Sequence, residues 1–153
     1  MKYNPVTVAN YFIQEKGKLG KLTPMKLIKL TYLAYSWYLA LNNGNQTLIN
    51  EKPQAWDYGP VFPSLYDSLK RFGRTEIDSI LPYENEEVIE SVDAEFLNKI
   101  WSLYGKYDGV QLSAMTHSEG TPWRKVYKRG CNSIIPDDDI LAHYQPKLKP
   151  IVS

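Results

Sequence analysis

Cys131, His117, His143 and Glu119 are the side chains of this sequence whose chemistry would suit catalysis. A thiol nucleophile needs a base within hydrogen-bonding reach, and His117 could in principle serve Cys131 in that way. The sequence around Cys131 nevertheless has no nucleophile elbow and no glycine run that would cradle a phosphate. We therefore predict no catalytic residue and no enzyme, and we keep a hydrolase that uses Cys131 and His117 as a distant alternative.

The spacing of the possible ligands does not indicate metal binding. His117 and His143 lie 26 positions apart, no second histidine stands four residues from either, and Cys131 is the single cysteine. Zinc sites combine several Cys or His ligands at short, regular spacings. We expect no metal and no cofactor, and the single cysteine also excludes an internal disulfide.

Two short segments suit the recognition of another molecule better than catalysis. Residues 56–61 read Trp-Asp-Tyr-Gly-Pro-Val, and residues 116–123 read Thr-His-Ser-Glu-Gly-Thr-Pro-Trp. Tyr and Trp are enriched at protein interfaces because they bury a large area and keep a polar group. Gly59 permits unusual backbone angles, and Pro60 fixes the entry to the following helix. The alternative for both segments is a turn that packs an indole ring onto the core.

A capping residue followed by a proline predicts the start of three of the helices that must position these segments. Asn4-Pro5, Thr23-Pro24 and Thr121-Pro122 each place a side-chain oxygen at the N-cap and a proline at the first helical position. We expect helices from residue 5 to about Gly17, from 24 to 41, and from 122 to about 129.

The second of these helices is predicted to be the centre of the fold. Residues 25–41 are apolar on nearly every side, with Lys26 and Lys29 as the only charged side chains. A helix that is apolar all round is a buried helix. We predict that it forms the core, that Lys26 and Lys29 mark its only solvated face, and that Asn43-Gly44 ends it.

The rest of the pattern predicts short elements. Residues 47–49 and 54–56 should pair as a small hairpin, and helices are expected at 62–72, 93–104 and 110–116 and from Pro136 onward. Residues 74–92 should form a surface loop. The predicted fold class is mainly α: a compact single-domain helical bundle around a buried central helix, with a small β-hairpin. Residues 1–146 would form the domain, and residues 147–153 a loosely ordered C-terminal tail.

The charge distribution favours neither nucleic acid nor membrane. The net charge is +1, although residues 1–76 carry ten Lys and Arg against five Asp and Glu. Basic runs could contact phosphates, but they are also typical of a solvated face. The longest apolar-rich run, residues 30–41, is shorter than the roughly 20 residues that span a bilayer, and the N-terminus has no signal-peptide core. We expect a cytoplasmic protein with no membrane contact.

An ordered set of motifs covers nearly the whole chain. It comprises residues 25–35, residues 56–61 with Tyr66, then Leu112-Ser113, Thr116-His117 and Pro122-Trp123. No one of these motifs is diagnostic, but their order in a chain of this size is quite specific. The sequence thereby resembles the Panacea-domain family, also described as SocA-like or GepA-like antitoxins and often phage-associated.

The resemblance implies the antitoxin of a toxin–antitoxin system, which neutralises a cognate toxin by direct protein–protein binding. One branch of the family is similar to a proteolytic adaptor that delivers its toxin to a AAA+ protease. The motif positions carry over as partner-binding candidates (Trp56, Asp57, Tyr58, His117 and Trp123) and as structural positions (Gly59, Pro60 and Pro122). His117 is also open to a structural reading, as a hydrogen-bonded link between two turns. The alternative function, which the basic N-terminal half suggests, is a regulatory DNA-binding protein that acts on its own operator.

Overall fold

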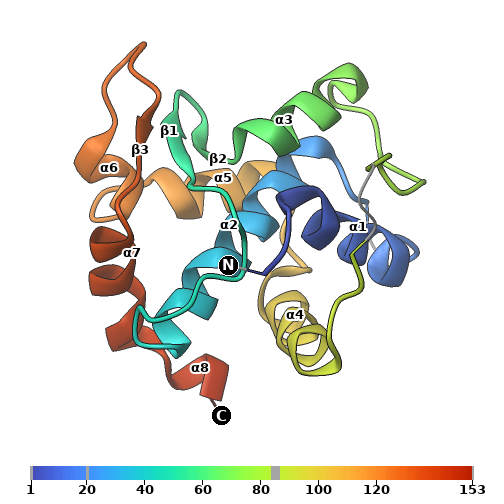
Figure 1. The fold of residues 1–153 in the computed structure, drawn as a ribbon. Helices are drawn as coiled ribbons and strands as arrows, with labels where there is room; N and C mark the ends of the chain where they lie inside the picture. The colour runs from blue at the N-terminus through green and yellow to red at the C-terminus, as the bar shows by residue number, and fades with distance from the viewer. Residues whose placement is uncertain (1, 20, 84–86, 153) are drawn as a thin grey trace.

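In the part of the chain that the structure describes, helices predominate and three short strands form one small sheet (Figure 1). The structure is a computed structural model that describes residues 2–19, 21–83 and 87–152. Its elements, in chain order, are α1 (Pro5–Lys16), α2 (Pro24–Leu41), β1 (Gln54–Trp56), β2 (Gly59–Val61), α3 (Pro63–Leu69), η1 (Lys70–Phe72), α4 (Ser91–Tyr104), α5 (Gly109–His117), α6 (Pro122–Val126), β3 (Ser133–Ile134), α7 (Asp137–Tyr144), η2 (Gln145–Lys147) and α8 (Lys149–Val152).

Helix α2 lies at the centre of the molecule, as its apolar composition predicts (Figure 1). It packs against α1, α3, α4, α5 and α7, and almost every residue along it is buried. Tyr32 and Tyr35 are completely enclosed despite their hydroxyl groups. The mainly helical class with a small β element is therefore confirmed.

The three predicted pairs of cap and proline all begin helices. The side chain of Asn4 accepts a hydrogen bond from the Val6 amide, that of Thr23 from the Lys26 amide, and that of Thr121 from the Arg124 amide. Each bond satisfies an amide that has no partner within the first helical turn. Helix α6 ends at Val126, earlier than expected, because Tyr127 adopts an extended backbone conformation.

The prediction that Lys26 and Lys29 mark a solvated face is wrong. Their side chains are 4% and 2% exposed. Lys26 Nζ donates to the Gly105 carbonyl over 2.6 Å and lies 4.9 Å from the centroid of a Trp101 ring. Lysine has an apolar stem long enough to pass through a core, so its ammonium can meet a backbone carbonyl at the far side.

The sheet also differs from the predicted hairpin. Residues 47–49 do not pair with β1; Ile49 instead forms an isolated bridge with Tyr3. Strand β1 pairs antiparallel with β2, with Trp56 opposite Gly59, and on its other side with β3, with Ala55 opposite Ser133. Asp57 and Tyr58 form the turn of the β1–β2 hairpin. The sequence predicts for Gly59 and Pro60 only the entry to the following helix, and not a strand.

Several helix ends and one long loop lie at or close to the positions that the sequence predicts. The helical segment that follows the hairpin ends at Gly73, whose φ is +57°, and α7 begins with three aspartates. The predicted loop has no helix or strand within residues 74–83 and 87–90, and residues 84–86 lie outside the described residues. Helix α4 begins two residues before the predicted start. The division into a domain of residues 1–146 and a tail stays a prediction.

Among the described residues, no helix combines the length and the apolar character that a membrane span requires.

Candidate protein-binding site

The connection between β1 and β2 depends on a glycine with an unusual backbone conformation. Gly59 has a φ of +115°, a conformation that side chains with a β-carbon rarely adopt. A β-carbon placed there would lie 3.0 Å from Lys29 Nζ and 3.6 Å from His117 Nδ1. Glycine is therefore favoured by the backbone conformation and by the close approach of Lys29.

Three carbonyls along this hairpin each accept a hydrogen bond from a different helix. Trp123 Nε1 of α6 donates to the Trp56 carbonyl over 2.7 Å. Ser113 Oγ of α5 donates to the Tyr58 carbonyl over 2.7 Å. Lys29 Nζ of α2 donates to the Pro60 carbonyl over 3.0 Å. We call residues 56–60 the anchored turn, because every second carbonyl in it is fixed to the helical body.

The donor from α2 is a lysine held almost entirely out of water. Lys29 is 2% exposed, and Pro60 is its only hydrogen-bond acceptor among the described residues. Burial disfavours the charged form of an amine and lowers the pKa of Lys29 to about 7. The buried amine therefore releases its proton more readily than an exposed lysine does.

His117 supports the same turn from α5. Its Nδ1 donates to the Ser113 carbonyl one helical turn earlier and lies 3.3 Å from Ser113 Oγ. Its ring meets the Trp123 ring edge-on, with centroids 5.1 Å apart, and Trp123 is stacked on Tyr127 at 4.3 Å. His117 thus positions the serine and the indole that hold the anchored turn.

Two side chains of the anchored turn, Asp57 and Tyr58, point toward solvent. Tyr58 is 74% exposed, and Asp57 is exposed and accepts a hydrogen bond from Tyr127 Oη over 2.6 Å. That bond raises the pKa of Tyr127. The half-buried Trp56 ring packs edge-on against Tyr66 with a centroid separation of 4.9 Å. A rigid turn therefore presents a carboxylate, a phenol and an indole edge.

The structure brings together the residues named from the sequence, although they lie in two distant segments. Trp56, Asp57 and Tyr58 form the turn, and His117 and Trp123 lie behind it. The structural positions Gly59, Pro60 and Pro122 are buried.

Sequence reasoning missed Lys29 as part of this site. Lys29 belongs to the motif of residues 25–35, but a lysine near a helix start suggests solvent contact. A charged residue inside an otherwise apolar helix was the signal that something buried must receive it.

A hollow of about 400 Å³ lies beside the anchored turn. Its lining comes from the start of α2, the anchored turn, α3 and the loop that leads into β3. Figure 1 shows that loop and the β1–β2 turn standing next to each other at one end of the molecule. We call this hollow the Lys29 pocket, since Lys29 is among its lining residues.

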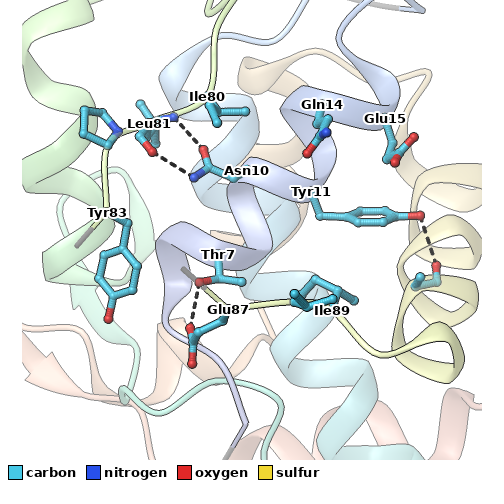
Figure 2. A pocket seen from close by; sticks show the side chains of 13 residues that line it. Thr7, Asn10, Tyr11, Gln14, Glu15, Ile80, Leu81, Tyr83, Glu87 and Ile89 are labelled. Atoms are coloured by element: carbon cyan, nitrogen blue, oxygen red, sulfur yellow. Dashed lines mark hydrogen bonds between the residues drawn. The ribbon is translucent and has the colours of Figure 1, made fainter. Parts of the chain in front are cut away.

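A larger hollow of about 800 Å³ lies between α1 and residues 80–83 and 87–89 (Figure 2). Its polar side chains are used to tie these segments to the helix. Asn10 exchanges two hydrogen bonds with the backbone of Leu81, and Thr7 donates to Glu87 over 2.7 Å. None of the site residues predicted from the sequence lines this hollow.

The residues considered for catalysis do not form a site. Cys131 is exposed, and His117 directs Nδ1 to the Ser113 carbonyl, with no contact to Cys131 among the described residues. The described part of the chain also contains no group of three or more His, Cys, Asp or Glu side chains that could hold a metal ion.

Comparison with known proteins identifies a family and a curated relative. The family model described as antitoxin SocA-like, Panacea domain, matches residues 27–124, which include the motifs of α2, the anchored turn, α5 and the start of α6. Antitoxin SocA of Caulobacter vibrioides (strain NA1000 / CB15N) is 24% identical over 131 residues. The aligned part covers 76% of this chain and 66% of the length of that relative. No solved structure gives a significant match.

Proposed function

We propose that this chain, which belongs to the antitoxin SocA-like Panacea-domain family, is a cytoplasmic antitoxin that neutralises a cognate toxin by binding it directly. The binding surface is centred on Trp56, Asp57 and Tyr58. The observation that carries the proposal is the anchored turn: three side chains from three helices fix its backbone, while Asp57 and Tyr58 remain exposed. His117 and Trp123 act on the partner through the turn that they position.

Pre-organisation is the physical reason to expect binding at this turn. A loop that is ordered only on binding loses conformational entropy, and that loss lowers affinity. The carbonyls of Trp56, Tyr58 and Pro60 are already fixed, so little of this cost remains. Tyrosine and tryptophan also dominate the residues whose truncation most weakens protein interfaces. A stable complex needs a total buried area of at least about 1,000 Å², so neighbouring surface must contribute as well.

The test is neutralisation in cells. The chain is co-expressed with the protein encoded by the neighbouring open reading frame, and growth and complex formation are measured. We expect the wild-type chain to restore growth and to co-purify with its partner, and Tyr58→Ala to weaken binding at least tenfold. Val92→Ala is the matched control, because Val92 is 65% exposed on α4, outside the anchored turn. A neighbour that is harmless and forms no complex would refute the proposal.

Neutralisation by binding alone and delivery to a AAA+ protease predict different fates for the toxin. If the chain only inhibits, the toxin should accumulate in a stoichiometric complex. One branch of the family is similar to a proteolytic adaptor. If this chain acts as such an adaptor, the toxin half-life should shorten when the chain is present. A pulse-chase measurement with and without the chain separates the two routes, and both keep the toxin as the direct partner.

Binding to its own operator is the second candidate, and the structure gives it less support. Lys26 and Lys29, two of the cations that suggested phosphate contact, are buried and donate to backbone carbonyls. An electrophoretic shift with the upstream DNA at two salt concentrations tests it, because non-specific contacts to phosphates weaken steeply as salt rises.

A further inference from the structure

The Lys29 pocket has walls that suit a side chain with a hydrocarbon stem. It has a volume of about 400 Å³ and opens beside the anchored turn. The side chains that surround it are mainly aliphatic and aromatic: Met25, Ile28, Trp56, Tyr58, Val61 and Tyr66. Pockets of this kind bind through apolar contact and gain specificity from a few polar groups.

The polar group that distinguishes this pocket is Lys29. An ammonium has three N–H donors, and Lys29 uses one, toward the Pro60 carbonyl. Among the described residues no carboxylate lies within ion-pair distance of it. A buried cation without a counter-ion is costly, and the cost falls when an anion approaches.

Four basic residues stand close in sequence to two of the lining glycines, although they are not part of the lining themselves. Gly73, which lines the pocket, lies between Arg71 and Arg74, and Gly130, another lining residue, follows Lys128 and Arg129. None of these four cations forms an ion pair with a carboxylate among the described residues.

Asp57 is the one acidic side chain among the described residues that line the pocket, and Tyr127 Oη donates to its carboxylate. The other titratable side chains that face Lys29 or the pocket are His117, across Gly59, together with Tyr58 and Tyr66.

We propose that the Lys29 pocket receives an acidic side chain, Asp or Glu, of the partner protein, with its carboxylate paired to Lys29 and its stem packed against the aromatic wall. This inference rests on the proposed function for the identity of the partner, and it deepens that function by naming the chemical group that the turn recognises. An aspartate or glutamate has both the anion and the short apolar stem that the pocket requires.

The pairing has a measurable consequence for Lys29. In the free protein burial lowers its pKa to about 7. A carboxylate within about 4–6 Å favours the charged amine and raises such a pKa by about 1–3 units. A neutral ligand of the same shape fills the pocket without that effect.

The titrations use the wild-type chain, and a variant serves only to assign one resonance. The protein is labelled with ¹³C at lysine Cε, and the Lys29 resonance is assigned from Lys29→Arg. The pH titration of that resonance is followed alone, with saturating 4-phenylbutyrate, and with saturating 4-phenylbutyramide. We expect 4-phenylbutyrate to raise the pKa of Lys29 by at least one unit, and 4-phenylbutyramide to leave it unchanged.

Two results would overturn the inference. If neither probe perturbs Lys29, or if the acid and the amide bind equally and shift the pKa alike, the pocket has no preference for a carboxylate. The outcome is independent of neutralisation. A pocket that binds the acid in a chain that neutralises no toxin would refute the proposed function alone, whereas neutralisation without a carboxylate-dependent shift would refute only this inference.

Discussion

The ammonium of Lys29 and the carbonyl of Pro60 are joined by a 3.0 Å hydrogen bond that links the central helix to the β1–β2 hairpin. Both residues belong to motifs by which the sequence resembles the Panacea-domain family, although 31 positions separate them. A buried amine is an unfavourable group in a core, so its presence indicates a role that a methionine or leucine would not fill. The bond fixes one end of the anchored turn, and the predictions below test its consequences.

The first prediction concerns the pH dependence of stability. Burial lowers the pKa of Lys29 from 10.5 to about 7, so between these pH values the unfolded chain binds the proton that the folded chain has released. Stability then rises with pH across this window. Between pH 7 and pH 9, the free energy of unfolding of the wild-type chain should increase by about 2 kcal/mol relative to Lys29→Met.

Urea denaturation at pH 7, 8 and 9 measures this difference. Lys18→Met is the matched control, because Lys18 is exposed and its side chain lies outside the core. Its stability should follow the wild-type curve at every pH. Parallel curves for the wild type and Lys29→Met would show that Lys29 keeps its ordinary pKa in the folded protein.

The second prediction concerns the glycine that lies against this lysine. Gly59→Ala forces a side chain into a φ of +115° and places its β-carbon 3.0 Å from Lys29 Nζ. We expect a loss of about 3 kcal/mol or more in the free energy of unfolding. Gly120→Ala is the control: its φ is +83° and no atom lies within 4 Å of the added carbon, so about 1 kcal/mol is expected. Equal losses in thermal unfolding would argue against the close approach of Lys29.

The third prediction concerns the junction between the N-terminus and α4. Asp93 is 2% exposed and accepts hydrogen bonds from Tyr3 Oη over 2.7 Å and from Lys2 Nζ over 3.2 Å. Asp93→Asn removes the charge that pairs with Lys2 and should lower the free energy of unfolding by about 2 kcal/mol. Asp78→Asn, at an exposed position, should change it by less than about 0.5 kcal/mol. Similar urea midpoints for the two variants would contradict this assignment.

The sequence predicts the helical skeleton well because the relevant signals are local. A capping side chain and a proline act within one helical turn. The start of a helix can therefore be predicted without the rest of the fold, as it is at Asn4-Pro5, Thr23-Pro24 and Thr121-Pro122. The continuous apolar run of α2 likewise predicts a central helix, since no solvated side is left for it.

The site depends on contacts that no local pattern contains. Trp56 and Trp123 are 67 positions apart, and the bond from the indole to the carbonyl exists only after α6 has packed beside the hairpin. For the same reason the sequence alone predicts solvent contact for a lysine near a helix start, whereas tertiary packing places the Pro60 carbonyl against Lys29. The resemblance to a family identifies the motif residues as a set. Only the folded structure shows which of them hold the anchored turn in place and which are exposed on it.

The fourth prediction separates these two groups of residues. Ser113 is buried and donates to the Tyr58 carbonyl over 2.7 Å, so it cannot itself offer a broad surface to a partner. Ser113→Ala leaves that carbonyl without its donor, and we expect the free energy of unfolding to fall by about 1–3 kcal/mol. The amides of residues 57–59 should exchange hydrogen faster. Toxin neutralisation should weaken although every exposed side chain of the turn is retained, because the turn must then be ordered on binding.

Ser102→Ala is the matched control, since Ser102 Oγ donates to the Lys99 carbonyl on the exposed side of α4, within a single helix. Its exchange pattern at the anchored turn and its neutralisation should equal those of the wild type. If Ser113→Ala loses stability while exchange at residues 57–59 and growth rescue stay unchanged, the hydroxyl merely satisfies a buried carbonyl. The rigidity of the turn would then have no part in recognition, and the affinity would have to come from the exposed side chains alone.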